Sequence, residues 1–230
     1  IDGIRLTVQK NGENWIIEFP DGVDVINIIE QYGRMPLPPY IKRKNNNSVD
    51  FERYQTVYAQ TTGSIAAPTA GFHFTKELLD EITGKGVDII KITLHIGIGT
   101  FFLIKESFVE NHRMHREFYN VSEDVKKYIK NAKKEGRRIV ACGTSVVRTL
   151  ETACTDDDEN NCADYTELFI YPGYRFQVVD AMITNFHLPR STPLLLVTAF
   201  TGRDSLMSCY QEAMAKGYRF YSYGDAMLIL

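Results

Sequence analysis

The hydrophobic and polar positions along the chain predict an alternation of strands and helices. Two extended runs, 4–9 and 15–19, flank Asn11-Gly12, a residue pair that favours a tight hairpin turn. Apolar residues at helical spacing predict helices over 23–32 and 50–58, then from Thr75, from Ser122, from about Ser145, and over Leu206 to Met214. Apolar or β-branched runs predict further strands over 64–67, 87–94, 118–121, 138–142, 167–170 and 176–184. We therefore expect an α/β fold, with a mixed or mostly parallel sheet and flanking helices.

The N-terminal hairpin sets residues 1–20 apart from the α/β part that we expect at 21–230. A hairpin of two strands alone is only marginally stable in water, so we expect it to belong to a larger β unit. The chain opens at Ile1 without a methionine, and we expect that a preceding segment belongs to the same protein. The helix over 23–32 is expected to be capped by Asp21 or Gly22 and to bury its apolar positions, Val25, Ile26, Ile28 and Ile29.

Charge and composition limit the partners that the chain can bind. The 26 Lys and Arg residues against 29 Asp and Glu give a net charge of -3, so a nucleic acid must meet a local basic patch. Lys42-Arg43-Lys44 and the basic residues over 126–138 are such patches, although solvated helix faces have the same pattern. Apolar runs are too short to cross a bilayer, and four unevenly spaced cysteines do not indicate a zinc or disulfide framework. We expect a cytoplasmic, monomeric protein that has no membrane partner.

Gly143-Thr144-Ser145 stands where a strand gives way to a helix. The N–H groups of the first helical turn lack partners within the helix, and two hydroxyl groups lie beside them, so an anion would bind well there. Arg148, expected in the first turn, can fold back to complete a clamp for a carboxylate or phosphate. A capped helix that carries a surface arginine is the alternative interpretation.

The five histidines lie in or beside predicted loops and strand ends, where functional sites are usually built. His112 and His115 form an H-x-x-H pair that lacks the glutamate and the helical spacing of zinc proteases, so we expect no metal site. A metal-dependent hydrolase that uses these two residues is a competing interpretation. Each histidine, taken singly, has a structural hydrogen-bonding role as its alternative.

A set of ordered motifs from Gly33 to the C-terminus resembles one enzyme family, the S-adenosylmethionine:tRNA ribosyltransferase-isomerases of queuosine biosynthesis. The first half carries Met35-Pro-Leu-Pro-Pro-Tyr40, Arg53-Tyr-Gln-Thr-Val-Tyr58, Ala66-Ala-Pro-Thr-Ala-Gly71 with His73, and Thr93-Leu-His-Ile-Gly97 through Phe101. The second half carries Met114-His-Arg-Glu117, Gly143-Thr-Ser145 with Arg148, Tyr171-Pro-Gly173, Thr184-Asn-Phe-His-Leu-Pro189 and Tyr223-Gly-Asp-Ala226.

The resemblance implies an enzyme that transfers and isomerises the ribosyl part of S-adenosylmethionine onto 7-aminomethyl-7-deazaguanine at the wobble position of tRNA. Epoxyqueuosine-tRNA forms, and adenine and methionine leave. S-adenosylmethionine is then a consumed co-substrate, and no metal is expected. The resemblance also implies an α/β domain with a smaller β-barrel domain, of which residues 1–20 would be the last hairpin. A non-catalytic tRNA-binding fragment is the competing class of function.

The site residues follow from these motifs and from what the chemistry needs. The sulfonium acidifies the ribose 5′ protons, so the reaction needs a general base, a proton donor for adenine and a pocket that orients the amine nucleophile. The predicted acid/base residues are His73, His95, His115 and Glu117. Those predicted to bind the methionine carboxylate or a tRNA phosphate are Thr144, Ser145 and Arg148, and those for base edges or ribose hydroxyls are Asn185 and His187. The predicted tRNA-binding residues are Lys42, Arg43 and Lys44.

Overall fold

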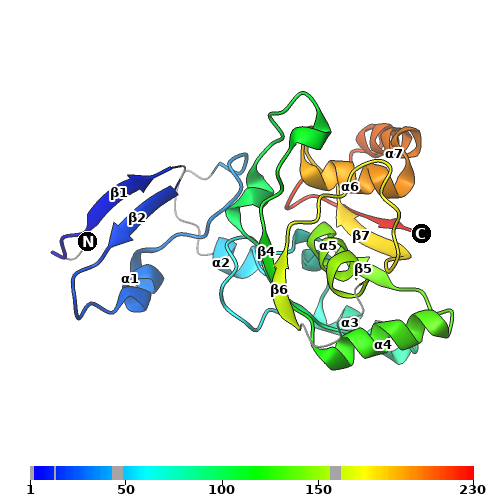
Figure 1. Ribbon diagram of the computed structural model, residues 1–230, viewed down its shortest axis with the longest axis horizontal. Coiled ribbons are helices and arrows are strands. Elements are labelled where there is room, and N and C mark those ends of the chain that lie inside the picture. Colours follow the sequence, from blue (N-terminus) through cyan, green and yellow to red (C-terminus); the bar gives the residue numbers. More distant parts are fainter. Residues whose placement is uncertain (1–2, 13, 43–48, 156–161) are drawn as a thin grey trace.

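The computed structural model describes residues 3–12, 14–42, 49–155 and 162–230, and it confirms the α/β class (Figure 1). Its strands are β1 (Thr7–Asn11), β2 (Asn14–Glu18), β3 (Thr93–His95), β4 (Glu117–Asn120), β5 (Val140–Cys142), β6 (Ala163–Thr166), β7 (Ala181–Asn185) and β8 (Ala226–Ile229). Its α-helices are α1 (Val25–Tyr32), α2 (Val49–Arg53), α3 (Lys76–Gly84), α4 (Glu123–Lys134), α5 (Thr144–Ala153), α6 (Thr192–Thr201) and α7 (Arg203–Ala215). Short 3-10 helices are η1 (Thr69–His73), η2 (Ile98–Phe101) and η3 (Val109–Asn111).

The described strands form two three-stranded sheets and one hairpin. The central sheet has the order β5-β7-β8, with β5 parallel to β7 and β8 antiparallel to β7. The second sheet, β3-β4-β6, is antiparallel throughout. The central sheet is therefore mixed, the first of the two expected arrangements, and β5 and β7 are the one parallel pair within the described part of the chain.

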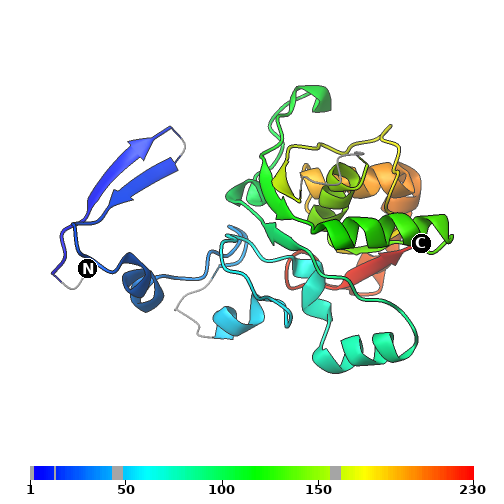
Figure 2. The same ribbon diagram turned by 60° about the horizontal axis from the view of Figure 1, so that its bottom comes forward.

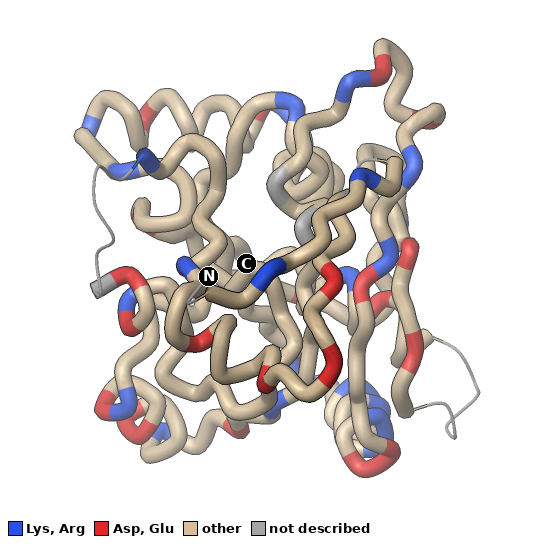
Figure 3. Tube along the Cα trace, turned by 90° about the vertical axis from the view of Figure 1, so that its left-hand side faces the viewer, with Lys and Arg blue, Asp and Glu red and all other residues tan. Residues whose placement is uncertain are grey.

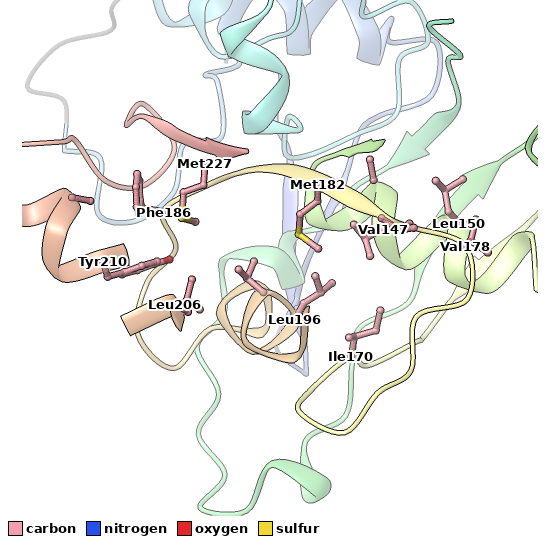
Figure 4. Packing of buried hydrophobic residues seen from close by; sticks show 14 of the residues in the cluster. Val147, Leu150, Ile170, Val178, Met182, Phe186, Leu196, Leu206, Tyr210 and Met227 are labelled. Atoms are coloured by element: carbon pink, nitrogen blue, oxygen red, sulfur yellow. The ribbon is translucent and has the colours of Figure 1, made fainter. Parts of the chain in front are cut away.

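The main hydrophobic core lies between the central sheet and helices α5, α6 and α7 (Figure 4). Met182 of β7 and Leu196 of α6 point toward one another in its middle, at 0% and 2% exposure. Val147 and Leu150 of α5 close the core on one side. Each such side chain contributes about 1.5–3 kcal/mol on burial, so this packing holds the ends of β5 and β7 in place.

Helix α4 forms as its sequence predicts. The Ser122 hydroxyl accepts a hydrogen bond from the Val125 N–H and so caps the first turn. Acidic residues occupy the first turn and lysines the last, which suits the helix dipole. Ile129 and Ala132 are buried, and Gly136, at φ 72°, ends the helix. Thr75 caps α3 in the same way.

The burial expected for α1 is corrected. Asp24 caps this helix, later than either expected residue, and Ile28 is its one buried apolar position among the described residues. Ile26 and Ile29 are 66% and 54% exposed. The reason is tertiary, because the β1–β2 hairpin and α1 stand to one side of the main body in both views (Figures 1 and 2).

Several predicted strands are shorter or shifted. The run over 87–94 pairs only as β3 at its end, and Val87 and Ile90 are 52% and 43% exposed. Residues 64–67 and 167–170 form no strand, whereas β6 lies just before the latter segment and β7 takes only the end of 176–184. A strand needs a neighbour to hydrogen-bond, which an apolar run alone does not provide.

Helical segments also differ from prediction. The helix expected over 50–58 ends at Arg53, and α6 and β8 form where no element was predicted. Ser191 caps α6 and Pro193 occupies its first turn, so the sequence carried a start signal for this helix. In α7 the expected apolar face is only partly buried, since Met214 is 60% exposed.

Candidate active site

The carboxyl ends of the parallel strands β5 and β7 lie side by side, and the chain leaves them at Gly143 and Asn185. Gly143 adopts φ 101°, which disfavours a side chain, while its N–H donates to the Ile183 carbonyl at 2.8 Å. Strand β8 begins at this same edge, opposite Asn185. In α/β sheets ligands bind in crevices beyond the carboxyl ends of strands, so this edge is where a site is expected.

A cavity, here called the main cavity, lies at this edge. It has about 850 Å³ of empty space, a volume that includes open solvent. It is lined by segments that are far apart in the sequence: Tyr40, Tyr54, 66–70, Ile96, Thr100, Phe102, Leu103, 143–146, 184–188, Ser191, Pro193, Tyr221 and Ser222. The predicted binding residues Thr144, Ser145, Asn185 and His187 are all among them.

Asn185, which is 2% exposed, fixes the groups at the end of β7. Its Oδ1 accepts a hydrogen bond from the Thr69 hydroxyl at 3.1 Å, and its amide donates to the Tyr221 carbonyl at 3.2 Å. The same amide nitrogen lies 3.3 Å from His73 Nε2. Burial lowers the pKa of His73 below its ordinary value. Asn185 therefore links His73, which lies on η1 outside the cavity lining, to the cavity.

His187 is held at the same edge by two contacts. Its Nε2 lies 2.6 Å from the Thr184 hydroxyl, and its backbone N–H donates to Tyr210 Oη at 2.7 Å. Burial lowers the pKa of His187 to about 4, so the ring is neutral at neutral pH. A neutral imidazole in this place offers a hydrogen bond to a ligand and carries no charge.

The lowered pKa of His187 predicts a pH dependence of stability. The unfolded chain takes up this proton below about pH 6.5 and the folded chain only below about pH 4, so the stabilisation is full above pH 6.5. It is lost as the pH falls from about 6.5 to about 4, by up to about 3 kcal/mol. Denaturant unfolding at pH 7, 5.5 and 4 measures this slope. His187→Gln is expected to flatten it, and an unchanged slope in that variant would contradict the prediction.

The N-terminus of α5 faces the cavity through Thr144 and Ser145. Gly143 stands at the N-cap position and has no side chain to cap the helix, so the first-turn N–H groups are available to a ligand. The aligned peptide dipoles favour negative charge at this end. The arrangement suits a carboxylate or phosphate group.

Arg148 lies in the second turn of α5 and is 5% exposed, so neither the expected first-turn position nor a surface arginine is correct. Its Nη1 lies 2.5 Å from Glu117 Oε2, and its Nε donates to the Leu168 carbonyl at 2.8 Å. Its Nη2 donates to the His115 and Thr166 carbonyls, each at 3.4 Å. The guanidinium thus fixes the Glu117 carboxylate and the backbone around it.

Glu117 and Arg148 border a second cavity of about 320 Å³, also partly open to solvent. Thr100, Thr144, Ser145 and Pro193 line both this cavity and the main cavity, so the two are adjacent. Burial raises the pKa of the Glu117 carboxyl, and Arg148 opposes that rise. A carboxyl group with a raised pKa, held in one orientation beside a cavity, suits proton transfer.

His95 and His115 are not among the described residues that line either cavity. His95 on β3 packs on the ring of Phe118 at 5.2 Å, and Gly63 leaves the space that its imidazole occupies. The exposed His115 packs on Phe102 at 5.5 Å, and Phe102 lines the main cavity. His115 is therefore one side chain away from the cavity, and His95 directly precedes Ile96, which lines it.

Most of the cavity residues were missed as site candidates by sequence reasoning, among them Tyr40, Tyr54 and Ser222. The signal was present, since the first two stand in the motifs 35–40 and 53–58 and Ser222 directly precedes the motif 223–226. None of them carries a charge or a metal-ligating group, so side-chain chemistry alone did not select them.

The predicted basic patches are only partly described. Lys42 is exposed, whereas Arg43 and Lys44 lie outside the described residues. On α4, Lys127 pairs with Glu123 and Lys133 with Asp180 at 2.7 Å. Along the Cα trace in Figure 3, Lys and Arg positions alternate with Asp and Glu positions among the described residues.

The H-x-x-H pair does not form a shared site. His112 Nδ1 lies 3.0 Å from Glu106 Oε2, whereas His115 contacts Phe102. Within the ranges that the structure describes, no three His, Cys, Asp or Glu side chains are grouped so as to hold a metal ion. A search of those ranges likewise finds no helix with the length and apolar character needed to cross a membrane.

Comparison with known proteins gives matches along almost the whole chain. A family profile described as "Queuosine biosynthesis protein" matches residues 3–229. A Geobacter sulfurreducens protein named S-adenosylmethionine:tRNA ribosyltransferase-isomerase is 49% identical over 231 residues, which cover 99% of this chain and 67% of that protein. Proteins of the same name from Francisella philomiragia and Natranaerobius thermophilus are 48% and 53% identical over 99% and 88% of this chain, and 67% and 58% of their own lengths.

A solved structure supports the same relationship. The crystal structure of an S-adenosylmethionine tRNA ribosyltransferase from Thermotoga maritima has a TM-score of 0.57 and 43% sequence identity to this chain. The match covers 70% of this chain and 51% of that protein. The chain thus spans about half to two thirds of the length of these relatives. With a family profile that matches nearly its full length, the chain belongs to the queuosine biosynthesis protein family.

Proposed function

We propose that this chain carries the ribosyl-transfer site of an S-adenosylmethionine:tRNA ribosyltransferase-isomerase. The single observation that carries the proposal is the main cavity, where motifs from six separate parts of the sequence meet at the carboxyl edge of β5 and β7. Relatives that bear this enzyme name are 48–53% identical to the chain. The reaction consumes S-adenosylmethionine and acts on tRNA that carries 7-aminomethyl-7-deazaguanine.

The binding groups are assigned by charge. The first-turn N–H groups of α5, with the hydroxyls of Thr144 and Ser145, receive the methionine carboxylate of S-adenosylmethionine. Asn185 and the neutral His187 offer uncharged hydrogen bonds to ribose hydroxyls or base edges. Arg148 acts on the ligand indirectly, because its donors are directed to Glu117 and to backbone carbonyls.

We assign the acid/base roles to the four residues predicted from the sequence: His73, His95, His115 and Glu117. The structural support differs from one residue to the next. Glu117 has the strongest support, since it borders a cavity that shares Thr144 and Ser145 with the main cavity. His73 follows, because Asn185 connects it to the cavity edge. His95 and His115 remain in the pool on their motifs alone.

The further parts of the proposal concern partners and organisation. Lys42, with Arg43 and Lys44, contacts the phosphates of tRNA, and no metal takes part. Residues 1–20 belong to a smaller β domain and residues 21–230 to the α/β catalytic domain. The position of β1 and β2 beside the main body is consistent with a separate β domain, although α1 stands beside them (Figure 2). We also propose that the protein is a cytoplasmic monomer.

The activity is tested by release of adenine from S-adenosylmethionine. Release is expected in the presence of tRNA that carries 7-aminomethyl-7-deazaguanine and not with unmodified tRNA, because the deazaguanine amine is the nucleophile. The assay is run on this chain alone and on this chain joined to the remaining part of the Geobacter relative. Adenine release by neither protein would falsify the enzymatic proposal. Salt-sensitive tRNA binding in its place would favour a tRNA-binding fragment.

A further inference from the structure

Tyr54 has a buried hydroxyl group that the proposed chemistry leaves unused. The residue is 1% exposed and lines the main cavity. Its Oη is the one fully buried side-chain polar atom that lacks a hydrogen-bond partner among the described residues. A buried polar group without a partner is destabilising, so such a group beside a cavity indicates a ligand contact.

The contacts around Tyr54 explain why its hydroxyl group has no hydrogen-bond partner among the described residues. The ring is held edge-on by Phe72 and Tyr223, with centroids 5.4 and 5.8 Å away. The Tyr223 hydroxyl donates to Asp50 at 3.0 Å. Tyr40 Oη lies 2.5 Å from Ser222 Oγ and also accepts a hydrogen bond from the Ser222 N–H at 3.3 Å. The hydroxyl groups of Tyr40 and Tyr223 are therefore paired with groups other than Tyr54.

The chemistry of this end of the cavity defines the group that it can bind. No Lys, Arg, Asp or Glu is found among the described residues that line the main cavity, so this end does not select a charged group. Burial raises the pKa of Tyr54, and the nearby Ser222 hydroxyl, which makes no hydrogen bond of good geometry with it, opposes that rise. The phenol is therefore protonated and able to donate. The rings of Tyr40, Tyr54 and Tyr221 offer aromatic surface. Aromatic surface together with a neutral donor suits a flat heteroaromatic ring that carries acceptor atoms.

We propose that the Tyr40, Tyr54 and Ser222 end of the main cavity binds a purine-type base, with the Tyr54 hydroxyl donating a hydrogen bond to an acceptor atom of that base. This proposal rests on the proposed function, because the two candidate bases are parts of its substrates. These are the adenine of S-adenosylmethionine and the 7-deazaguanine of the tRNA. The carboxylate of the donor is assigned to the N-terminus of α5, which also lines the main cavity.

The test compares Tyr54→Phe with the matched control Tyr174→Phe. Both changes remove one hydroxyl and keep the ring, but the Tyr174 hydroxyl donates to Glu151 at 3.1 Å and is not among the described residues lining the cavity. Calorimetric binding uses adenosine, S-adenosylmethionine and free 7-aminomethyl-7-deazaguanine as probes, and thermal unfolding is measured on the same samples. Tyr54→Phe is expected to weaken binding of one base class about tenfold, the effect of one buried hydrogen bond.

Stability separates a ligand contact from a structural one. Tyr54→Phe is expected to keep or raise the thermal midpoint, because it removes an unpaired buried hydroxyl, whereas Tyr174→Phe lowers the midpoint and leaves base binding unchanged. Weaker binding of adenosine and S-adenosylmethionine assigns the site to adenine, and weaker binding of the deazaguanine assigns it to the tRNA base. Either result supports the proposal. A lowered midpoint for Tyr54→Phe, or unchanged binding of every probe, overturns it, as does a wild-type chain that binds none of the probes.

The base-binding test and the adenine-release test can fail independently, so failure of the base site is distinguishable from failure of the proposed function. If Tyr54→Phe weakens base binding but the wild-type protein releases no adenine, the base site stands and the proposed enzymatic function falls. If the wild-type protein releases adenine and Tyr54→Phe retains both its ligand affinity and its KM for tRNA, the function stands and the base site falls.

Discussion

Arg148→Ala is expected to lower the free energy of unfolding by about 3–5 kcal/mol, the loss typical of breaking a buried ion pair from one side. The substitution leaves the Glu117 carboxylate, which is 8% exposed as a residue, without its cation. It also removes the donors to the Leu168, His115 and Thr166 carbonyls. Denaturant unfolding at pH 7 measures the loss, and adenine release is expected to fall by about 100-fold or more because Glu117 loses its fixed orientation.

A double variant separates the folding role of this pair from its chemical role. Replacing both partners with apolar residues, as in Glu117→Leu with Arg148→Met, removes the unpaired charge and is expected to recover most of the lost stability. Adenine release is expected to stay low, since the carboxylate is gone. A double variant that regains both stability and activity would show that the pair has only a structural role.

Glu151→Ala is expected to lower the free energy of unfolding by about 3–5 kcal/mol, because it leaves several buried donors unpaired. The Glu151 carboxylate, which is 3% exposed as a residue, accepts hydrogen bonds from the N–H groups of residues 177, 178 and 179, each at 2.9 Å. It also accepts one from the Tyr174 hydroxyl. For a chain of this length the loss corresponds to a fall in the thermal midpoint of about 8–15 °C.

Two further variants test this assignment. Tyr174→Phe removes a single one of the four donors, so a loss of about 1 kcal/mol is expected. Glu135→Ala changes an exposed residue at the end of α4, and its effect is expected to stay within about 0.5 kcal/mol. If Glu151→Ala proves no more damaging than Glu135→Ala, the carboxylate does not hold the 174–179 segment in place.

Local sequence signals predicted the hairpin and the helices whose ends are defined by turn or capping residues. Asn11-Gly12 gave the hairpin, Ser122 and Gly136 bounded α4, and Thr75 capped α3. These features depend on residues within one turn of each other, so the rest of the fold has little influence on them. The α/β class followed from the alternation, along the chain, of segments whose apolar residues have strand spacing and segments whose apolar residues have helical spacing.

The pairing of strands did not follow from local signals. The apolar run over 87–94 has high strand propensity, yet only Thr93–His95 meets a neighbour, β4. Conversely, residues 226–229 pair with β7 in a short strand whose sequence gave no distinct signal. Strand formation needs a partner from elsewhere in the chain, and a single sequence does not name that partner.

The sequence by itself determined the α/β class, the caps of α3 and α4, and, through its ordered motifs, the family and several residues that line the main cavity. Only the tertiary structure decided that Arg148 is buried against Glu117, that His95 packs on Phe118 and is not among the lining residues, and that Tyr54 brings an unpaired hydroxyl to the cavity wall. The physical reason is that burial and hydrogen-bond partners are set by segments distant in the chain, whereas capping and periodicity are set by neighbours.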